Sequence, residues 1–290
     1  MKIREIAGVQ PLIDTLSLCL QSTYVVNEQN AISLLIVANA ESAKTTVLYR
    51  FSNLDFVSYY DDITQKKLLD EFIPFVRAKQ KRTLAIPDLI NSVEKQKVTR
   101  AGFLNIIKSA MDDTGLTAIS TPHLQLQRAL ENDVSLGGTK FNVITAVTKG
   151  ALMEGGKDTP SMKKIMVKSG LLSRFLPFSY EYSISLVKKI FDLQSGKDLD
   201  DKDYCEIPEL NKTPTIVECD YEYGIQLDIL ATMLNNEFDK SGYGIRPHRN
   251  LIRLVKANAL INGRDKVTKS DIDRVMDLSK YFNFKFTSMG

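Results

Sequence analysis

The sequence predicts an α/β fold in which a parallel sheet is followed by a small helical domain. Apolar runs of strand length lie at 31–38, 55–60, 83–86, 141–148 and 175–180. Helical patterns separate several of these runs, and such alternation is typical of parallel strands joined by crossover helices. Beyond residue 220 the strand runs stop, and helical patterns follow at 221–239, 247–262 and 269–283.

The first apolar run carries the clearest strand signal. Residues 31–38 read Ala-Ile-Ser-Leu-Leu-Ile-Val-Ala, and a short run so rich in Ile, Leu and Val suits a strand buried on both faces of a parallel sheet. Residues 1–30, which precede it, are expected to form an arm and a short helix. Further elements are expected as helices at 44–51, 64–79 and 99–112 and as a short strand at 116–120.

Changes in composition divide the chain into three parts. We expect residues 1–195 to form the α/β domain and 221–290 to form the helical domain. Residues 196–220 are polar and carry two prolines, so they are expected to be a linker or exposed loop. The last helix is predicted to begin with Thr268 as its N-cap and Asp271 at its third position, a shorter-chain version of the capping box.

The composition itself is that of an ordinary globular chain. Among 290 residues, 38 Lys and Arg oppose 35 Asp and Glu, which leaves a net charge of +3. Charge this balanced gives no strong field for nucleic acid, so any basic patch must be local. Three cysteines and two histidines are too few for a disulfide framework or a histidine-rich metal centre. No apolar run approaches the roughly 18 residues of a membrane span, and we expect a reduced, cytoplasmic protein with no membrane partner.

A candidate phosphate loop follows the first predicted strand and precedes a predicted helix. It matches the spacing G-x-x-x-x-G-K-[ST] with both glycines replaced by alanine, through Ala38, Asn39, Ala40, Glu41, Ser42, Ala43, Lys44 and Thr45, with Thr46 next. Such a loop wraps backbone N–H groups around phosphates, while its lysine binds the β and γ oxygens and its hydroxyl binds Mg²⁺. The segment predicts ATP and Mg²⁺ as ligands, with Thr45 at the metal. The alternative is an ordinary strand-to-helix turn with Lys44 solvated at the surface.

The two alanines weigh against the phosphate-loop interpretation. Wherever the loop needs a positive φ, a Cβ costs roughly 1–2 kcal/mol. A methyl group at Ala38 or Ala43 would also crowd the β-phosphate.

Acidic residues follow two of the other predicted strands. Asp88 ends the strand at 83–86 and is a candidate to order Mg²⁺ through water, although a helix N-cap is an equally good interpretation. Leu89 stands where a glutamate that polarises the attacking water would be useful. Asp62, or Glu41 in the loop, is a hypothetical substitute base, and a helix cap is the favoured alternative for Asp62.

The order of these motifs resembles that of the AAA+ ATPases. The phosphate loop, the strand ending at Asp88, a polar-ended strand, Leu-Leu-Ser-Arg-Phe at 171–175 and an arginine-bearing helix occur in that sequence. The resemblance covers about residues 30–285 and is nearest to the branch of the minichromosome-maintenance helicases and magnesium chelatases, with phage and archaeal relatives. It implies a three-layer αβα P-loop domain with a parallel sheet, followed by a helical lid.

The resemblance also assigns roles to residues outside the loop. Arg174 matches the finger that reaches the γ-phosphate of a neighbouring subunit, although it also suits a surface arginine on a short helix. The sensor-1 position falls on Thr148, or on Thr145, because the usual asparagine is missing. Residues 246–254 resemble the sensor-2 helix of the lid, and Arg249 matches its arginine. With Asp88 and Asp62, these form the candidate catalytic set.

Two functions follow as hypotheses. The first is an ATP-driven oligomeric motor or remodeller, with ATP, further copies of the chain in a ring or a partner AAA+ subunit, and DNA as partners. The lysine groups 163–164 with 168, and 188–189, are compatible with contacts to phosphates, although they also suit ordinary solvated surface. The second is a degenerate AAA+ module that hydrolyses ATP weakly or not at all and acts as a regulator or assembly scaffold. A metal- or nucleophile-based hydrolase finds little support.

Overall fold

The computed structural model describes residues 2–77, 80, 82–89, 103, 104, 107, 108, 111, 141–154, 161–197, 204–237 and 245–289. The strand expected at 116–120 and most of the helix expected at 99–112 lie outside the described residues.

The main sheet has six strands in the order β3-β4-β5-β2-β6-β8, and each pairing between neighbours is parallel. The strands are β2 (Ser33–Ala38), β3 (Val57–Tyr59), β4 (Thr83–Ile86), β5 (Asn142–Thr148), β6 (Phe175–Tyr182) and β8 (Thr287–Met289). The predicted parallel sheet is confirmed, and five of these strands coincide with the five apolar runs. β2 lies between β5 and β6, and its residues are buried on both faces, as a continuous aliphatic run requires.

Three strands were not predicted: β1 (Lys2–Ala7) in the N-terminal arm, β7 (Tyr204–Glu206) and β8. β7 lies within the segment expected to be a linker and pairs antiparallel with β1. β8 follows the last helix and adds to the edge of β6. β7 and β8 have three residues each, which is too few for an alternating pattern to be recognised. The domain boundaries at 195/196 and 220/221 stay a prediction.

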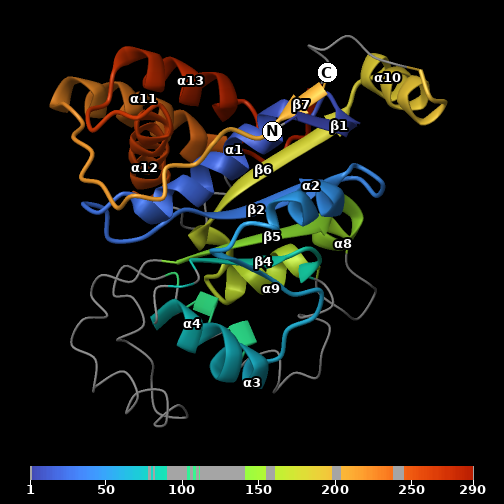
Figure 1. Cartoon of the computed structure of the whole chain (residues 1–290), viewed down its shortest axis with the longest axis horizontal. Coiled ribbons are helices and arrows are strands. Elements are labelled where there is room, and N and C mark those ends of the chain that lie inside the picture. Colours follow the sequence, from blue (N-terminus) through green and yellow to red (C-terminus); the bar gives the residue numbers. More distant parts are fainter. Residues whose placement is uncertain are drawn as a thin grey trace.

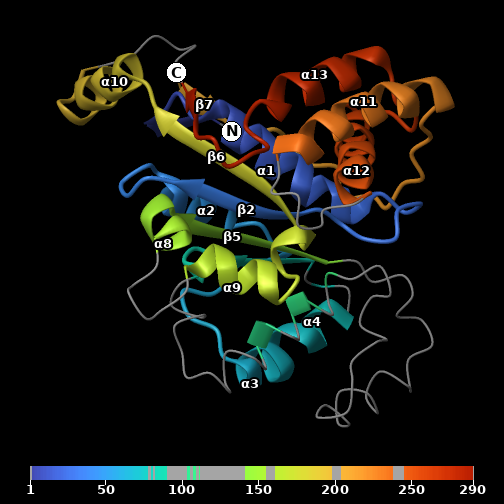
Figure 2. The same ribbon diagram turned by 180° about the vertical axis from the view of Figure 1, so that it is seen from behind.

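Helices cover both sides of the sheet, which gives three layers (Figures 1 and 2). In both views α1 (Gln10–Gln21), α11 (Tyr221–Glu237), α12 (Arg246–Ile261) and α13 (Lys269–Ser279) lie towards the β6 end of the strand order. α3 (Gln65–Lys67) and α4 (Ile73–Arg77) lie towards the β4 end, and α9 (Met162–Lys168) lies in front of the sheet in Figure 2. The remaining helices include α2 (Lys44–Phe51), α8 (Lys149–Met153) and α10 (Ile184–Gln194). Among the described residues, no helix is both long and apolar enough to cross a bilayer.

The helix predicted at 64–79 is interrupted in its middle. A π-helical turn, η2 (Leu68–Phe72), separates α3 from α4, and Pro74 follows it at the second position of α4. Proline has no N–H to donate to the carbonyl four residues earlier, so the regular ladder cannot continue through this position.

The helical part is tied to the α/β domain by buried charges. Glu28 Oε1 accepts a hydrogen bond from Lys256 Nζ at 2.6 Å, and its Oε2 accepts from Arg253 Nε at 3.3 Å. The two cationic side chains are 8% and 10% exposed, which leaves little water to screen the ion pairs. α12 also packs directly on α1, so the helical part shares the core of the main domain.

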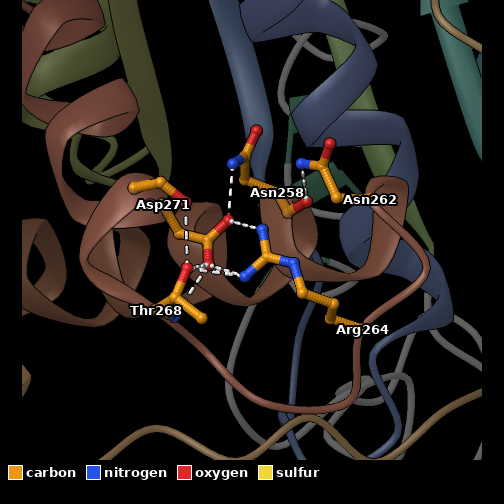
Figure 3. Close-up of polar contacts among 6 residues, drawn as sticks. Asn258, Asn262, Arg264, Thr268 and Asp271 are labelled. Atoms are coloured by element: carbon orange, nitrogen blue, oxygen red, sulfur yellow. Dashed lines mark hydrogen bonds and ion pairs between the residues drawn. The ribbon is translucent and has the colours of Figure 1, made fainter.

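A second buried network fixes the turn between α12 and α13 (Figure 3). Arg264 donates to both carboxylate oxygens of Asp271 at 2.8 Å, and Asn258 Nδ2 donates to Oδ1 at 2.6 Å. The backbone N–H of Thr268 donates to Oδ2 at 2.8 Å, and Thr268 and Asp271 form a capping box. The helix start predicted from Thr268 and Asp271 is therefore confirmed.

We expect Asp271→Asn to lower the free energy of unfolding by about 2 kcal/mol, because the half-buried guanidinium of Arg264 then loses the charge of a fully buried carboxylate. Burial alone raises the pKa of Asp271, but the hydrogen bonds from Arg264, Thr268 and Asn258 outweigh it and hold the pKa below its ordinary value. The carboxylate thus stabilises the fold above the unfolded pKa and loses this effect as the pH falls through the folded pKa. Urea titrations at neutral and acid pH should show the difference between wild type and variant shrinking in acid. Asp273→Asn, an exposed change on the same helix, should have no effect at either pH.

Candidate functional site

The candidate phosphate loop lies at the carboxyl edge of the sheet, between β2 and α2. Ala38, the last residue of β2, is in register with Thr148 of β5 and Tyr180 of β6. From β2 the chain crosses towards β3, whereas from β6 it leads towards β8 on the other side. Neighbouring strands whose connections diverge in this way open a crevice at their carboxyl ends, where ligands of parallel α/β sheets bind.

Lys44, the first residue of α2, points into the loop rather than into solvent. Its ammonium donates to the carbonyl of Asn39, to Ser42 Oγ at 2.9 Å and to the carbonyl of Ala38 at 3.3 Å. The side chain is buried, and burial lowers the pKa of Lys44 to about 8 against a smaller raising effect of Asp88. The three acceptors are neutral oxygens, so the loop holds a positive charge without a carboxylate in hydrogen-bond contact.

Positive φ angles occur at two non-glycine residues of the loop. Glu41 has φ 57° and Ala43 has φ 60°, whereas Ala38 lies in the extended backbone of β2. The strain expected at the first alanine therefore does not arise, because that residue ends a strand. The strain expected at Ala43 does arise, and the backbone of Glu41 is strained as well. The cost is roughly 1–2 kcal/mol for each residue.

We expect Ala43→Gly to raise the free energy of unfolding by about 1 kcal/mol, because glycine adopts a positive φ without a Cβ clash. Ala38→Gly is the matched control and should lower stability, since glycine in a strand interior costs conformational entropy. Chemical denaturation of the two variants beside wild type checks the opposite signs. Destabilisation of both would contradict the assignment of strain to Ala43.

The acid and hydroxyl candidates lie at the same edge. Asp88 follows β4 by two residues and is close enough to Lys44 to raise its pKa. Thr148 ends β5, where its Oγ1 accepts from the backbone N–H of Ala151 at 3.4 Å and caps α8. Thr145 is fully buried, and its hydroxyl has no hydrogen-bond partner among the described residues. Leu89 is buried, and its aliphatic side chain supplies no carboxylate to the site.

Asp62 lies farther away. It follows β3, which pairs with β4 as expected, but β3 stands three strands from β2 in the sheet. Three strand spacings amount to about 14 Å, and the side chain is exposed at the outer edge. We therefore give Asp62 no part in the proposal below.

Arg174 lies at the opposite end of the strands from the loop, at their amino ends. It ends the 3₁₀ turn η6 (Leu172–Arg174) immediately before β6, and its Nη1 donates to the carbonyl of Gly170. Gly170 has φ 70°, and a Cβ there would come within 3.3 Å of that guanidinium. Gly170 thus permits both the turn after α9 and the close approach of the arginine.

A second arginine, which the sequence analysis did not assign, accompanies Arg174. Arg246 at the start of α12 donates from Nη1 to Ser173 Oγ at 2.7 Å. Arg249 lies three residues later in the same helix, so both share a face. The sequence could have pointed to Arg246, because the segment that resembles the sensor-2 helix begins at this residue. Only the structure shows that this end of α12 lies beside Ser173.

The two edges are too far apart to form one site within a chain. Phe175 is in register with Ser33 and Tyr180 with Ala38, so the loop and Arg174 lie about 17 Å apart along the strands. Figures 1 and 2 show α2 and α10 near the end of β6 and α12 towards its beginning. An arginine side chain cannot span this distance, so Arg174 does not reach the phosphate loop of its own chain.

A pocket of about 250 Å³ adjoins the loop. Loop and α2 residues form one wall, and β6 and α10 form the other. Its lining residues are Ala7, Glu41, Ala43, Thr46, Tyr182, Ile190, Leu193 and Gln194. Both polar and apolar groups therefore face the space beside the phosphate loop.

The residues present fit a magnesium-bound triphosphate. An ammonium already sits inside the loop, Thr45 and Thr46 are exposed on the first turn of α2, and Asp88 acts on the same ammonium. The described part of the chain holds no cluster of three His, Cys, Asp or Glu side chains suited to a metal. A metal here would depend on the ligand's own oxygens, as Mg²⁺ does beside phosphates.

No protein-family model matches the chain, and no curated protein matches it. Among solved structures, a full-length MCM homolog from Methanopyrus kandleri is similar, with a TM-score of 0.52 and 14% sequence identity over 96% of this chain. This chain shares the fold of that homolog. It spans 56% of the length of that homolog, and at this identity the similarity concerns the fold alone. The predicted three-layer αβα domain with a helical part is thereby confirmed.

The two lysine groups lie on different helices. Lys163, Lys164 and Lys168 belong to α9, and Lys188 and Lys189 belong to α10. Figures 1 and 2 show α9 beside β4 and β5 and α10 beyond the end of β6, so the two groups are well separated.

Proposed function

We propose that the chain binds ATP with Mg²⁺ at the loop 38–46 and hydrolyses it as one subunit of an oligomeric motor or remodeller that acts on DNA. The observation that carries the proposal is the buried Lys44 ammonium, which lies inside the loop and donates there to the carbonyls of Ala38 and Asn39 and to Ser42 Oγ. A cation buried in this way gains much from an anionic ligand, because a low-dielectric setting strengthens the attraction. The fold shared with the MCM homolog also supports the proposal, because the loop lies at the carboxyl ends of the parallel strands.

The residues take the following roles in the proposal. Lys44 turns from the loop carbonyls to the β and γ oxygens, and the backbone N–H groups at the start of α2 face the phosphates. Thr45 offers its hydroxyl to Mg²⁺, and Asp88 orders the metal's water ligands. When bound, Mg²⁺ supplies charge neutralisation at the phosphate oxygens. Thr148 is the sensor-1 candidate, beside Ala38 in the sheet. The adjoining pocket receives the nucleoside end of the ligand.

Completion of the site requires a second copy. Arg174 carries the positive charge that the transferring phosphoryl group needs, and in its own chain it lies at the other edge of the sheet. Arg246 and Arg249 start the helix beside it, and Arg249 stays the candidate sensor 2. The proposal therefore pairs the loop of one subunit with the arginine edge of the next, which is the end of the sheet where Arg174, Arg246 and Arg249 lie. Repetition of such a head-to-tail contact closes into a ring.

ATP turnover at high protein concentration, with and without DNA at low salt, tests this function. The motor proposal expects turnover that rises with protein concentration and with DNA. The resemblance of the motifs to the minichromosome-maintenance branch supports DNA as the substrate. Failure to bind single- or double-stranded DNA at low salt would remove DNA from the proposal and leave the ATPase standing.

A regulatory or scaffold module without fast hydrolysis is the second candidate. Two observations favour it: Leu89 is buried where a catalytic glutamate would be useful, and Ala43 holds a strained φ. This candidate expects ATP to bind without turnover, with or without DNA. Single-turnover measurement on the oligomer separates the two functions, because a motor cleaves bound ATP and a scaffold retains it.

We expect the affinity for a non-hydrolysable ATP analogue to fall by about tenfold between pH 7 and pH 9. The pKa of Lys44 is about 8 in the free protein, so at higher pH the ligand must bind together with a proton. Isothermal titration in buffers of different ionisation enthalpy would measure this proton uptake. Lys44→Arg keeps the charge at both pH values and should lose the pH dependence. Equal profiles for the variant and wild type would show that Lys44 does not couple to the phosphates.

A further inference from the structure

We infer that Tyr180 is a positioning residue that holds the phosphate loop in its strained shape through a hydrogen bond from β6. The inference rests on the proposed function, because the loop that Tyr180 holds is the proposed triphosphate site. Tyr180 does not contact the proposed ligand position through this hydroxyl, so it would act on the phosphates only through the loop backbone.

The bond joins a rigid strand to the middle of the loop. Tyr180 is fully buried, and its Oη donates to the backbone carbonyl of Ser42 at 2.5 Å. Ser42 is itself buried and lies between Glu41 and Ala43, the two loop residues with positive φ. The hydroxyl therefore contacts the loop at the residue that both strained residues flank.

The tyrosine is well fixed for this task. Its ring packs edge-on against Phe178 and tilted against Tyr182, with ring centroids 5.9 Å apart in each pair. The backbone of Tyr180 is in register with Ala38. Burial raises the pKa of Tyr180 far above its ordinary value, so the hydroxyl stays neutral and can donate at any working pH. A donor on a central strand cannot follow the loop if the loop moves.

The bond is also independent of the ligand. The ammonium of Lys44 must leave the carbonyls of Ala38 and Asn39 to reach a phosphate, so its own contacts cannot hold the loop in the bound state. The bond from Ser42 Oγ to the Asn39 carbonyl lies inside the loop and moves with it. The hydroxyl of Tyr180 comes from outside the loop and can persist in both states.

A loop with glycine at its positive-φ positions would need no such support, because glycine adopts these angles without strain. Here Glu41 and Ala43 carry a Cβ at those angles, and residues in strained backbone persist only where the surroundings over-determine them. The need for Tyr180 should accordingly depend on the residue at position 43, which gives the inference its sharpest test.

The experiment compares Tyr180→Phe, Ala43→Gly and the double variant with wild type. Tyr281→Phe is the control, because Tyr281 is a buried ring that stacks on Phe178 of the same strand, outside the loop. The first readout is amide hydrogen exchange of residues 39–45 in the protein without nucleotide. The second is the affinity for the magnesium complex of a non-hydrolysable ATP analogue, together with its pH profile.

Tyr180→Phe should speed exchange in the loop by roughly tenfold, with little change in β2 and β6. It should lower the affinity for the analogue by about tenfold. A looser loop lets water reach Lys44 and raises the pKa of its ammonium, so the affinity should be lost at a higher pH than in wild type. The double variant should recover most of the affinity and protection. Tyr281→Phe should alter neither readout.

Three outcomes would overturn the inference: unchanged loop exchange in Tyr180→Phe, equally faster exchange across β2, β5 and β6, or no recovery when Ala43→Gly is added. Failure of the proposed function is distinguishable from these. If wild type binds no nucleotide, the exchange data on the unliganded protein still decide whether Tyr180 holds the loop.

Discussion

Lys44→Met is expected to abolish nucleotide binding and ATP turnover while leaving the unliganded protein at least as stable as wild type at neutral pH. The side chain is buried, and burial lowers the pKa of Lys44 from 10.5 to about 8. This shift corresponds to a cost of up to about 3 kcal/mol for keeping the ammonium charged in the fold. Methionine retains much of the aliphatic volume and removes that charge. The same residue would thus be unfavourable for folding and necessary for the ligand.

The pH dependence of stability separates this account from simple damage to the fold. Between about pH 8 and 10.5 the unfolded chain binds a proton at Lys44 that the folded chain releases, so wild-type stability rises across that range. Lys44→Met should lack this rise. Thermal unfolding with and without a magnesium-bound ATP analogue, over this pH range, gives both readouts. Lys66→Met, an exposed change on α3, should keep the ligand-dependent shift. A ligand-dependent shift that survives in Lys44→Met would contradict the account.

Arg174→Ala is expected to lower turnover by about 10³-fold and to leave the affinity for ATP close to wild type. The reason is geometric: in its own chain Arg174 stands about 17 Å along the sheet from the loop, so the residue cannot contribute to binding there. Its contribution would fall on the phosphoryl group of a neighbouring subunit, where charge develops during transfer. Turnover and equilibrium binding, measured on the same preparation, check the two halves of this prediction.

Mixing two inactive variants makes the prediction stricter. Lys44→Met subunits have an intact arginine edge, and Arg174→Ala subunits have an intact loop. Contact between the arginine edge of the first and the loop of the second restores a complete site, so the mixture should hydrolyse ATP although neither variant does so alone. A mixture that assembles but stays inactive would show that Arg174 does not act between subunits.

The sequence predicted the parts of this molecule that depend on local pattern. The aliphatic run 31–38 and the turn after it led to β2, the loop and α2, because a buried central strand has a composition that few other elements share. The capping box at Thr268 and Asp271 was readable for the same reason, since its two residues lie three positions apart.

The rest depends on contacts between distant segments. Nothing in residues 175–182 distinguishes Tyr180 from any buried strand aromatic, and its bond to Ser42 arises only from the register of β6 with β2. Arg246 was visible within a motif, but its contact with Ser173 spans 73 residues of chain. The strained φ of Ala43 was anticipated, whereas that of Glu41 was not, because alanine at a glycine position is a sequence signal and glutamate at a variable position is none.

A structure of the protein with a magnesium-bound, non-hydrolysable ATP analogue tests the central claim most directly. The account predicts phosphate oxygens within hydrogen-bond distance of Lys44 Nζ, with that ammonium released from the carbonyls of Ala38 and Asn39 and the Tyr180 bond to Ser42 intact. An analogue at saturating concentration that leaves Lys44 on those carbonyls, with no phosphate over residues 38–45, would contradict it.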